Sequence, residues 1–142
     1  MSDDKLPNSV LFVCSLNSIR SPIAEGIMKA KFGDDVYVQS CGLGTGELNE
    51  LMVAIMREKG IDMSAHISKT LNEIGDSSFD IAIAFSEDVG AAVKSYFDDS
   101  DTVVEIWVTP DPTAGAQDVR AMMDNYRSVR SHIEGKIRIK FG

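Results

Sequence analysis

The chain has 142 residues, of which 44% are hydrophobic and 25% charged, and its formal net charge is -8 at pH 7. This length suits one domain with one core, and no apolar run approaches the roughly 18 residues that a membrane span needs. The negative charge argues against nucleic acid as a partner, because basic surfaces bind phosphate backbones. Two cysteines are too few for a disulfide scaffold or a cysteine zinc site. We expect no metal site and no cofactor.

The start of the chain, Met1–Lys5, is polar and acidic, unlike a secretory signal. We therefore expect a cytoplasmic protein. We expect residues 1–8 to form a flexible tail and residues 9–142 to form a single domain that is monomeric. The short apolar run Ser9–Val13 predicts a buried strand at the start of this domain.

Helices and strands then alternate along the chain. Pro22 suits the first turn of a helix, where its missing N–H is no loss, and the apolar stripe of this helix ends before Gly33. The patterns next predict a strand at Val36–Ser40, a helix on Leu48, Leu51, Met52 and Ile55, a helical turn within Ser64–Ile74, a strand at Phe79–Phe85, a helix at Glu87–Tyr96 and a strand at Val103–Trp107. A long amphipathic helix closes the chain, with one face made of Val119, Met122, Met123, Tyr126, Val129, Ile133 and Ile137.

This alternation predicts an α/β fold, a three-layer sandwich with a central four-stranded parallel sheet covered on both faces. In such sheets the ligand lies at the carboxyl ends of the strands. Cys14, Ser40, Ser86 and Asp111 each end or follow a predicted strand. We therefore expect all of these polar residues at the same edge of the sheet.

The segment Cys14-Ser15-Leu16-Asn17-Ser18-Ile19-Arg20-Ser21 joins the first strand to the first helix. Such a loop can surround a tetrahedral oxyanion with backbone N–H groups, and the helix dipole favours negative charge there. Cys14 supplies a nucleophile, whose thiolate form an adjacent arginine and a helix N-terminus both favour. Arg20 supplies a planar fork for two oxygens. These features predict a cysteine-dependent phosphate-ester hydrolase with its phosphate-binding loop after the first strand.

Two further residues complete the predicted chemistry. The Ser21 hydroxyl can donate a hydrogen bond to the Cys14 thiolate and help the sulfur to leave in a second step. Asp111 lies between two prolines that stiffen its backbone. Its carboxyl group can give a proton to the leaving alcohol and then act as a base on the hydrolytic water.

Val13-Cys14, Arg20-Ser21-Pro22 and Asp111-Pro112-Thr113-Ala114-Gly115 resemble the low-molecular-weight protein tyrosine phosphatase family, and the resemblance covers nearly the whole chain. It implies that Cys14 is the nucleophile and that Asp111 is the general acid. It also implies that the phosphoryl group is bound by Ser15, Leu16, Asn17, Ser18, Ile19, Arg20 and Ser21.

The same resemblance implies a hydrogen-bond network that shapes the loop, made by Asn17, Ser21, Ser40 and His66. The chain departs from the family at several positions, however. Leu16 stands where family loops usually carry glycine, and Ile19 where many carry a second cysteine. Thr113 and Ala114 stand where aromatic residues commonly sandwich a phosphotyrosine ring.

The main interpretation is thus a phosphomonoester hydrolase, a tyrosine phosphatase that acts through a phosphocysteine on a phosphorylated protein or small phosphate ester. One alternative is an arsenate reductase that uses an external low-molecular thiol, since Ala84–Phe97 holds no cysteine to relay a disulfide. Another is a non-catalytic module that binds phosphate or phosphoproteins, although binding alone needs neither Cys14 nor Asp111. Cys41 is expected to be a small packed residue, with a redox partnership to Cys14 as the alternative.

Overall fold

A computed structural model of the protein describes residues 6–75 and 78–142. Its centre is a parallel sheet of four strands in the order β2-β1-β3-β4. The strands are β1 (Ser9–Cys14), β2 (Tyr37–Gly42), β3 (Ile81–Ala84) and β4 (Val103–Ile106). The predicted fold class is confirmed.

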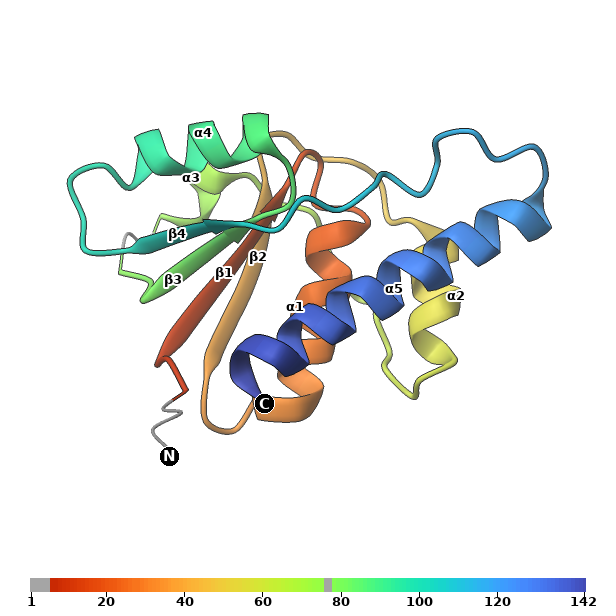
Figure 1. The fold of residues 1–142 in the computed structure, drawn as a ribbon, viewed down its shortest axis with the longest axis horizontal. Coiled ribbons are helices and arrows are strands. Elements are labelled where there is room, and N and C mark those ends of the chain that lie inside the picture. The colour runs from red at the N-terminus through yellow and green to blue at the C-terminus, as the bar shows by residue number, and fades with distance from the viewer. Residues whose placement is uncertain (1–5, 76–77) are drawn as a thin grey trace.

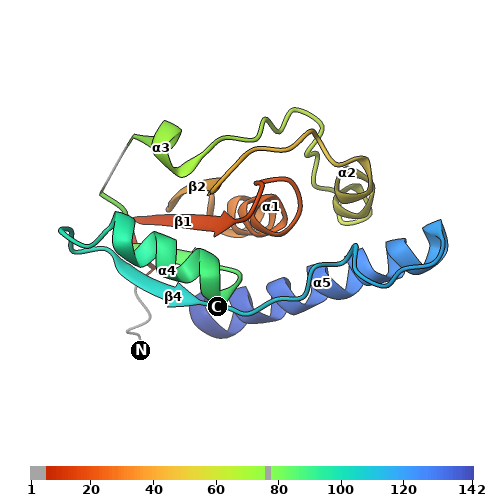
Figure 2. The same ribbon diagram turned by 90° about the horizontal axis from the view of Figure 1, so that it is seen from above.

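Helices cover both faces of this sheet, as Figure 1 shows. On one face lie α1, α2 and α5, and on the other lie α3 and α4. Figure 2 shows the same elements from above, with α4 overlying the strands of the sheet. The helices are α1 (Arg20–Phe32), α2 (Glu50–Arg57), α3 (Leu71–Ile74), α4 (Glu87–Tyr96) and α5 (Val119–Phe141). Within the described part of the chain, none of them is long and apolar enough to cross a membrane.

The central strand β1 explains why the first apolar run is continuous. All six of its residues are buried, because helices cover both faces of a parallel sheet. Phe12 and Cys14 belong to the core cluster on the α1 and α5 side, whereas Leu11 and Val13 belong to the cluster on the α4 side. Cys14 therefore points toward the same layer as α1, whose first turn follows it in the sequence.

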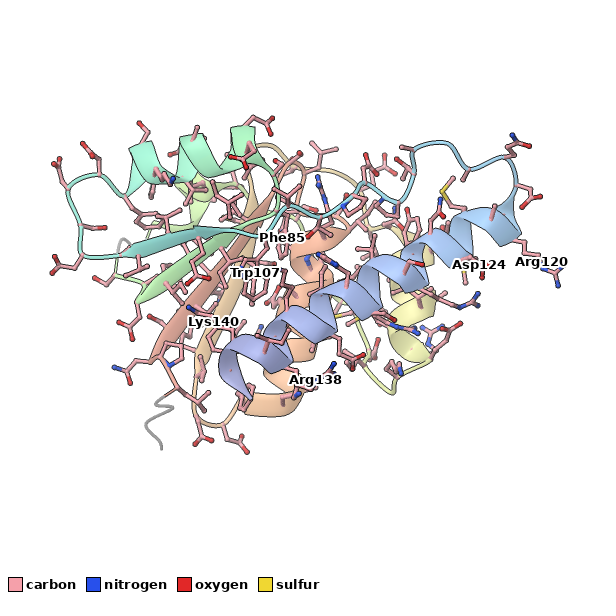
Figure 3. The ribbon with its side chains drawn as sticks, viewed as in Figure 1. Phe85, Trp107, Arg120, Asp124, Arg138 and Lys140 are labelled. Carbon is pink, nitrogen blue, oxygen red and sulfur yellow. The ribbon has the colours of Figure 1, made fainter. Side chains whose placement is uncertain are left out.

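Aromatic side chains fill the layer between the sheet and α5. The ring centroids of Phe12 and Phe85 are 6.1 Å apart, and those of Phe85 and Trp107 are 6.3 Å apart. Figure 3 shows Phe85 and Trp107 in this layer, with Lys140 nearby at the end of α5. Lys140 forms an ion pair with Glu105 of β4, so the last turn of α5 is fixed to the sheet by both packing and charge.

Three details differ from the predicted elements. Residues 1–5 of the predicted tail lie outside the described residues, but Leu6 packs against the core and the Asn8 N–H donates to Asp80 Oδ2 at 2.7 Å. Val119 is 71% exposed and does not contribute to the buried face of α5, because α5 begins beyond the edge of the core. The strand β2 continues to Gly42, because its pairing with β1 extends to Cys14.

A cluster of charges joins the end of α2 to α5. Glu58 accepts hydrogen bonds from Arg127 Nη2 and from Arg130 Nη1, each at 2.8 Å. Arg130 is buried and also donates to the Ile55 carbonyl at 2.6 Å. The hydrogen bonds from Arg127 and Arg130 lower the pKa of Glu58 from 4.5 to about 2.

We expect Glu58→Gln to flatten the acid dependence of stability. The lowered pKa means that the carboxylate stabilises the fold above pH 4.5 and loses this contribution as the pH falls toward about 2. Urea unfolding across this range should show a steeper fall in the free energy of unfolding for the wild type than for the variant. The exposed Glu47 provides the control, since Glu47→Gln should keep the wild-type slope. Equal slopes for Glu58→Gln and the wild type would contradict the ion-pair assignment.

Candidate active site

A hollow of about 90 Å³ lies where β1 meets α1. Cys14 is the last residue of β1 and Arg20 the first of α1, while Asp111 reaches the hollow from the loop after β4. The predicted convergence at the carboxyl edge of the sheet therefore holds for these residues. The lining residues are Cys14, Ser15, Leu16, Ser18, Ile19, Arg20 and Asp111.

The Cys14 sulfur lies against Ser21 in the first turn of α1. Its Sγ lies 2.9 Å from Ser21 Oγ, and the Ser21 N–H donates to it at 3.4 Å. Cys14 is 3% exposed and Ser21 is fully buried. Hydrogen-bond donors and the positive end of a helix dipole both favour a thiolate over a thiol. The arrangement can therefore hold a negatively charged sulfur at the base of an anion-binding hollow.

Asn17 organises the loop from behind the hollow. It is fully buried and has a left-handed backbone with φ of 54°, a conformation that asparagine tolerates better than most residues. Its Oδ1 accepts a hydrogen bond from the Lys69 N–H at 3.0 Å. Its Nδ2 donates to Ser21 Oγ and to Ser40 Oγ, both at 2.9 Å. The side chain thus links the loop to α1, to β2 and to the segment before α3.

The main chain at Asn17 is held as well. The carbonyl oxygen accepts hydrogen bonds from His66 Nε2 at 2.8 Å and from Ser68 Oγ at 2.7 Å. On the neighbouring strand, a Cβ atom on Gly42 would lie 2.7 Å from the Asn17 nitrogen, so only glycine permits this approach. The structure brings together all four residues of the predicted network, with Asn17 and Ser21 behind the hollow rather than lining it.

The Arg20 side chain is held by two main-chain carbonyl groups at the carboxyl edge of the sheet. Its Nη1 donates to the Thr109 carbonyl at 2.9 Å and to the Phe85 carbonyl at 3.5 Å. These carbonyls follow β4 and β3, so the guanidinium spans the carboxyl edge of the sheet. No other hydrogen bond of this side chain forms within residues 6–75 and 78–142. Its remaining N–H groups can therefore bind an oxyanion in the hollow.

Asp111 is part of a tight turn. Its Oδ1 accepts hydrogen bonds from the Thr113 N–H at 2.9 Å and from Thr113 Oγ1 at 2.7 Å. Partial burial raises the pKa of Asp111, but these hydrogen bonds and the Arg20 charge outweigh it, so that the pKa is lowered overall. Asn125 Nδ2 on α5 donates to the Pro112 carbonyl at 3.1 Å and holds the loop in place.

Cys41 lies on the opposite face of the sheet from Cys14. It is fully buried in the cluster that contains Val13, its register partner on β1. A direct disulfide would require one of the two side chains to cross the sheet, and the redox partnership is therefore not supported by this geometry. Burial, followed by the nearby Cys14, raises the pKa of Cys41 to about 12, which keeps its thiol protonated and unreactive.

The sequence model of the low molecular weight phosphotyrosine protein phosphatase family matches residues 9–139. The chain belongs to this family. The glutaredoxin arsenate reductase of Synechocystis sp. is 29% identical over 129 residues, which cover 90% of this chain and 92% of that protein. The arsenate reductase of Bacillus licheniformis is 31% identical over 130 residues and covers 92% of each chain. A solved arsenate reductase in its oxidized state superposes with a TM-score of 0.79 at 25% identity, covering 94% of this chain and 96% of that one.

Ser86 follows β3 at the carboxyl edge of the sheet, as expected, but it does not line the hollow, and its hydroxyl donates to Asp88 Oδ1 at 2.7 Å. Glu25 on α1 was not predicted. It is 6% exposed and accepts hydrogen bonds from Ser40 Oγ at 2.5 Å and from Lys29 Nζ at 2.6 Å. The available signal was a lone carboxylate inside the apolar stripe of the first helix.

We expect Asn17→Ala to destabilise the protein by about 2–4 kcal/mol, because it removes partners from buried polar groups and places alanine in a left-handed conformation. Chemical denaturation of the wild type and the variant measures this difference. Asn72→Ala, at an exposed position on α3, is the matched control and should change stability by less than about 0.5 kcal/mol. A loss at Asn17 no larger than that at Asn72 would show that the network does not support the loop.

Proposed function

We propose that this protein is an arsenate reductase that uses an external thiol. The observation that carries the proposal is the small hollow of about 90 Å³ at Cys14, because the described residues that line it include no aromatic side chain. The similarity to proteins named arsenate reductases along nearly the whole chain supports it. The name of the Synechocystis relative includes glutaredoxin, which supports a thiol partner outside the chain.

The rim of the hollow favours a small inorganic substrate. Thr113 and Ala114, which follow the Asp-Pro pair, are both exposed and present no ring. The segment Gly42–Leu48 on the other side contains no aromatic residue either. An aryl phosphate would bind without flat partners for its ring, whereas arsenate needs only hydrogen-bond donors and positive charge.

In the first step, the Cys14 thiolate attacks arsenic and one arsenate oxygen leaves as water. Arg20 and the loop N–H groups hold the other oxygens, and protonated Asp111 supplies a proton to the departing oxygen. A Cys14–arsenic bond has then formed and an arsenic–oxygen bond has broken, with arsenic still in the As(V) state.

The reducing electrons come from two external thiols. Attack on the Cys14 sulfur is blocked, since that residue is 3% exposed and Ser21 lies beside its sulfur. The first thiol instead condenses at arsenic and releases a second water. The second thiol then attacks the sulfur of the first, a disulfide forms between them, and the electron pair stays on arsenic as As(III). Water finally cleaves the Cys14–arsenic bond, so that arsenate and two thiols give arsenite, one disulfide and one net water.

A second candidate, a phosphomonoester hydrolase, is favoured by the position of Asp111 at the hollow. Here the Cys14 thiolate attacks phosphorus, Asp111 protonates the leaving alcohol, and a phosphocysteine forms. Water activated by the same carboxylate then hydrolyses this intermediate. The residues and their roles in the first step are those of arsenate reduction.

We expect Cys14→Ser to abolish arsenate reduction, with a loss of about a thousandfold or more, because the hydroxyl cannot replace the thiolate. Cys41→Ala should keep activity within about twofold, because Cys41 lies in the opposite core layer. Arsenite formation with glutathione, with and without glutaredoxin, is measured beside hydrolysis of para-nitrophenyl phosphate and a phosphotyrosine peptide.

Hydrolysis that depends on Cys14 without arsenate reduction would replace the first candidate by the second. Phosphate binding with neither reaction would leave only a binding module. Loss of arsenate reduction in Cys41→Ala, in a variant that folds, would overturn the external-thiol scheme.

We expect Thr113→Val to shift the alkaline limb of the pH–rate profile to higher pH. The valine removes the hydroxyl that donates to Asp111, so the pKa of Asp111 should rise toward its ordinary value. A step that needs protonated Asp111 slows as the pH passes above this pKa, and a higher pKa therefore extends the active range. Thr113→Ser keeps the hydroxyl and should retain the wild-type limb. Identical profiles for both variants would argue against Asp111 as the acid.

A further inference from the structure

We propose that Glu25 is a positioning residue for a buried series of hydrogen bonds. It fixes which group donates at each step, and so keeps the Ser21 hydroxyl donating its hydrogen bond to the Cys14 sulfur. The series runs from Glu25 through Ser40, Asn17 and Ser21 to Cys14. The proposal rests on the proposed function only in taking Cys14 as the reactive thiol.

The donor and acceptor roles in this series of hydrogen bonds are set first at Asn17. The Lys69 main-chain N–H can only donate, so the atom that faces it at 3.0 Å is the Asn17 carbonyl oxygen. The two hydrogens of Asn17 Nδ2 must then point to Ser21 and Ser40. Both serine oxygens therefore act as acceptors toward Asn17.

Glu25 determines what Ser40 does with its own hydrogen. Ser40 is fully buried, and its hydroxyl donates to Glu25 Oε1 at 2.5 Å. An ionised carboxylate has no hydrogen to give, so Ser40 cannot reverse and donate toward Asn17. Lys29 Nζ lies 2.6 Å from the other oxygen, Oε2, and forms an ion pair with it.

The same carboxylate is close to the second support of Asn17. His66 Nε2 donates to the Asn17 carbonyl at 2.8 Å, while His66 Nδ1 lies 4.0 Å from Glu25 Oε1. Glu25 thus neighbours both groups that hold Asn17, one at its side chain and one at its main chain. Lys29 and, when protonated, His66 lie closest to this carboxylate, and Lys69 and Asp62 are the other charged residues that line the same pocket.

At the other end, Ser21 has one hydrogen left to donate. Its hydroxyl already accepts from Asn17, and it can donate to Cys14 Sγ at 2.9 Å or to the Cys41 carbonyl at 3.3 Å. The sulfur is nearer and, as a thiolate, carries a full charge, so it is the better acceptor. If Ser40 instead turned its own hydrogen toward Asn17 Nδ2, two donors would face each other, the amide would move away from Ser21, and the Ser21 hydroxyl would be free to turn away from Cys14.

The direction in which Glu25→Gln changes the reactivity of Cys14 distinguishes this positioning role from a through-space effect of the Glu25 charge. Removing a negative charge near a thiolate stabilises it, so a through-space role of Glu25 predicts a more reactive Cys14 in Glu25→Gln. In the positioning role, the oxygen of the glutamine faces Lys29 and its NH2 group faces Ser40. Ser40 then has no acceptor on residue 25, and the donor and acceptor roles along the series of hydrogen bonds are no longer fixed. Cys14 should then become less reactive.

The test is alkylation of Cys14 by iodoacetamide, followed by intact mass across pH 5 to 9, in a Cys41→Ala background with a single thiol. We expect Glu25→Gln to slow alkylation about fivefold near pH 6 and to move the half-maximal rate to higher pH. The rate at high pH, where every thiol is ionised, should stay unchanged. A variant that only unfolds locally would instead expose Cys14 and react faster.

Ser40→Ala provides the matched control, because it cuts the link between Glu25 and Asn17. It should slow alkylation similarly, and adding Glu25→Gln should give no further change. Unchanged or faster alkylation in Glu25→Gln, or an additive effect in the double variant, would overturn the proposal. Because alkylation needs neither arsenate nor a phosphate ester, its outcome is independent of whether the proposed reaction occurs.

Discussion

The site depends above all on the side-chain amide of Asn17. This group joins the loop after β1 to α1, to β2 and to the segment before α3, through hydrogen bonds with Ser21, Ser40 and Lys69. The left-handed backbone at Asn17 turns the loop around the hollow, and the buried amide holds that turn through its hydrogen bonds. Leaving any of these groups unpaired in a buried position costs about 1–3 kcal/mol, so the loop is rigid before an anion binds.

Such rigidity matters because the molecule as a whole repels anions. The chain carries 22 acidic and 14 basic side chains, and its net charge of -8 opposes the approach of arsenate or phosphate. Attraction must come from groups that act over a few ångströms, namely Arg20 and the N-terminus of α1. Both are placed by the carboxyl edge of the sheet, where the Thr109 and Phe85 carbonyls hold the guanidinium beside Cys14.

Sequence patterns predicted what is local in the chain. The Cys14–Ser21 loop and the helix Glu87–Tyr96 could be found because their residue types and spacing carry the information directly, and alternation of strands and helices placed Asp111 at the same edge. Glu25 gave only the weak signal of a carboxylate in an apolar stripe, because its hydrogen-bond partner Ser40 lies in another element. Periodicity also could not show that Val119 lies beyond the edge of the core. An apolar stripe shows which face of a helix is buried, but not how far along the helix the rest of the core extends.

The buried position of Cys14 also constrains how any covalent intermediate is resolved. A nucleophile that attacked its sulfur would have to approach opposite the bond to arsenic or phosphorus, a direction occupied by β1 and Ser21. Attack at the central atom, from the open side of the hollow beside Asp111, meets no such obstacle. Attack of water on phosphorus and attack of a thiol on arsenic would thus follow the same path into the hollow and differ only in the nucleophile. For the two reactions proposed above, the choice is then set by the oxyanion and the nucleophile that reach the rim, where Leu16 is 49% exposed, because both reactions use the same loop.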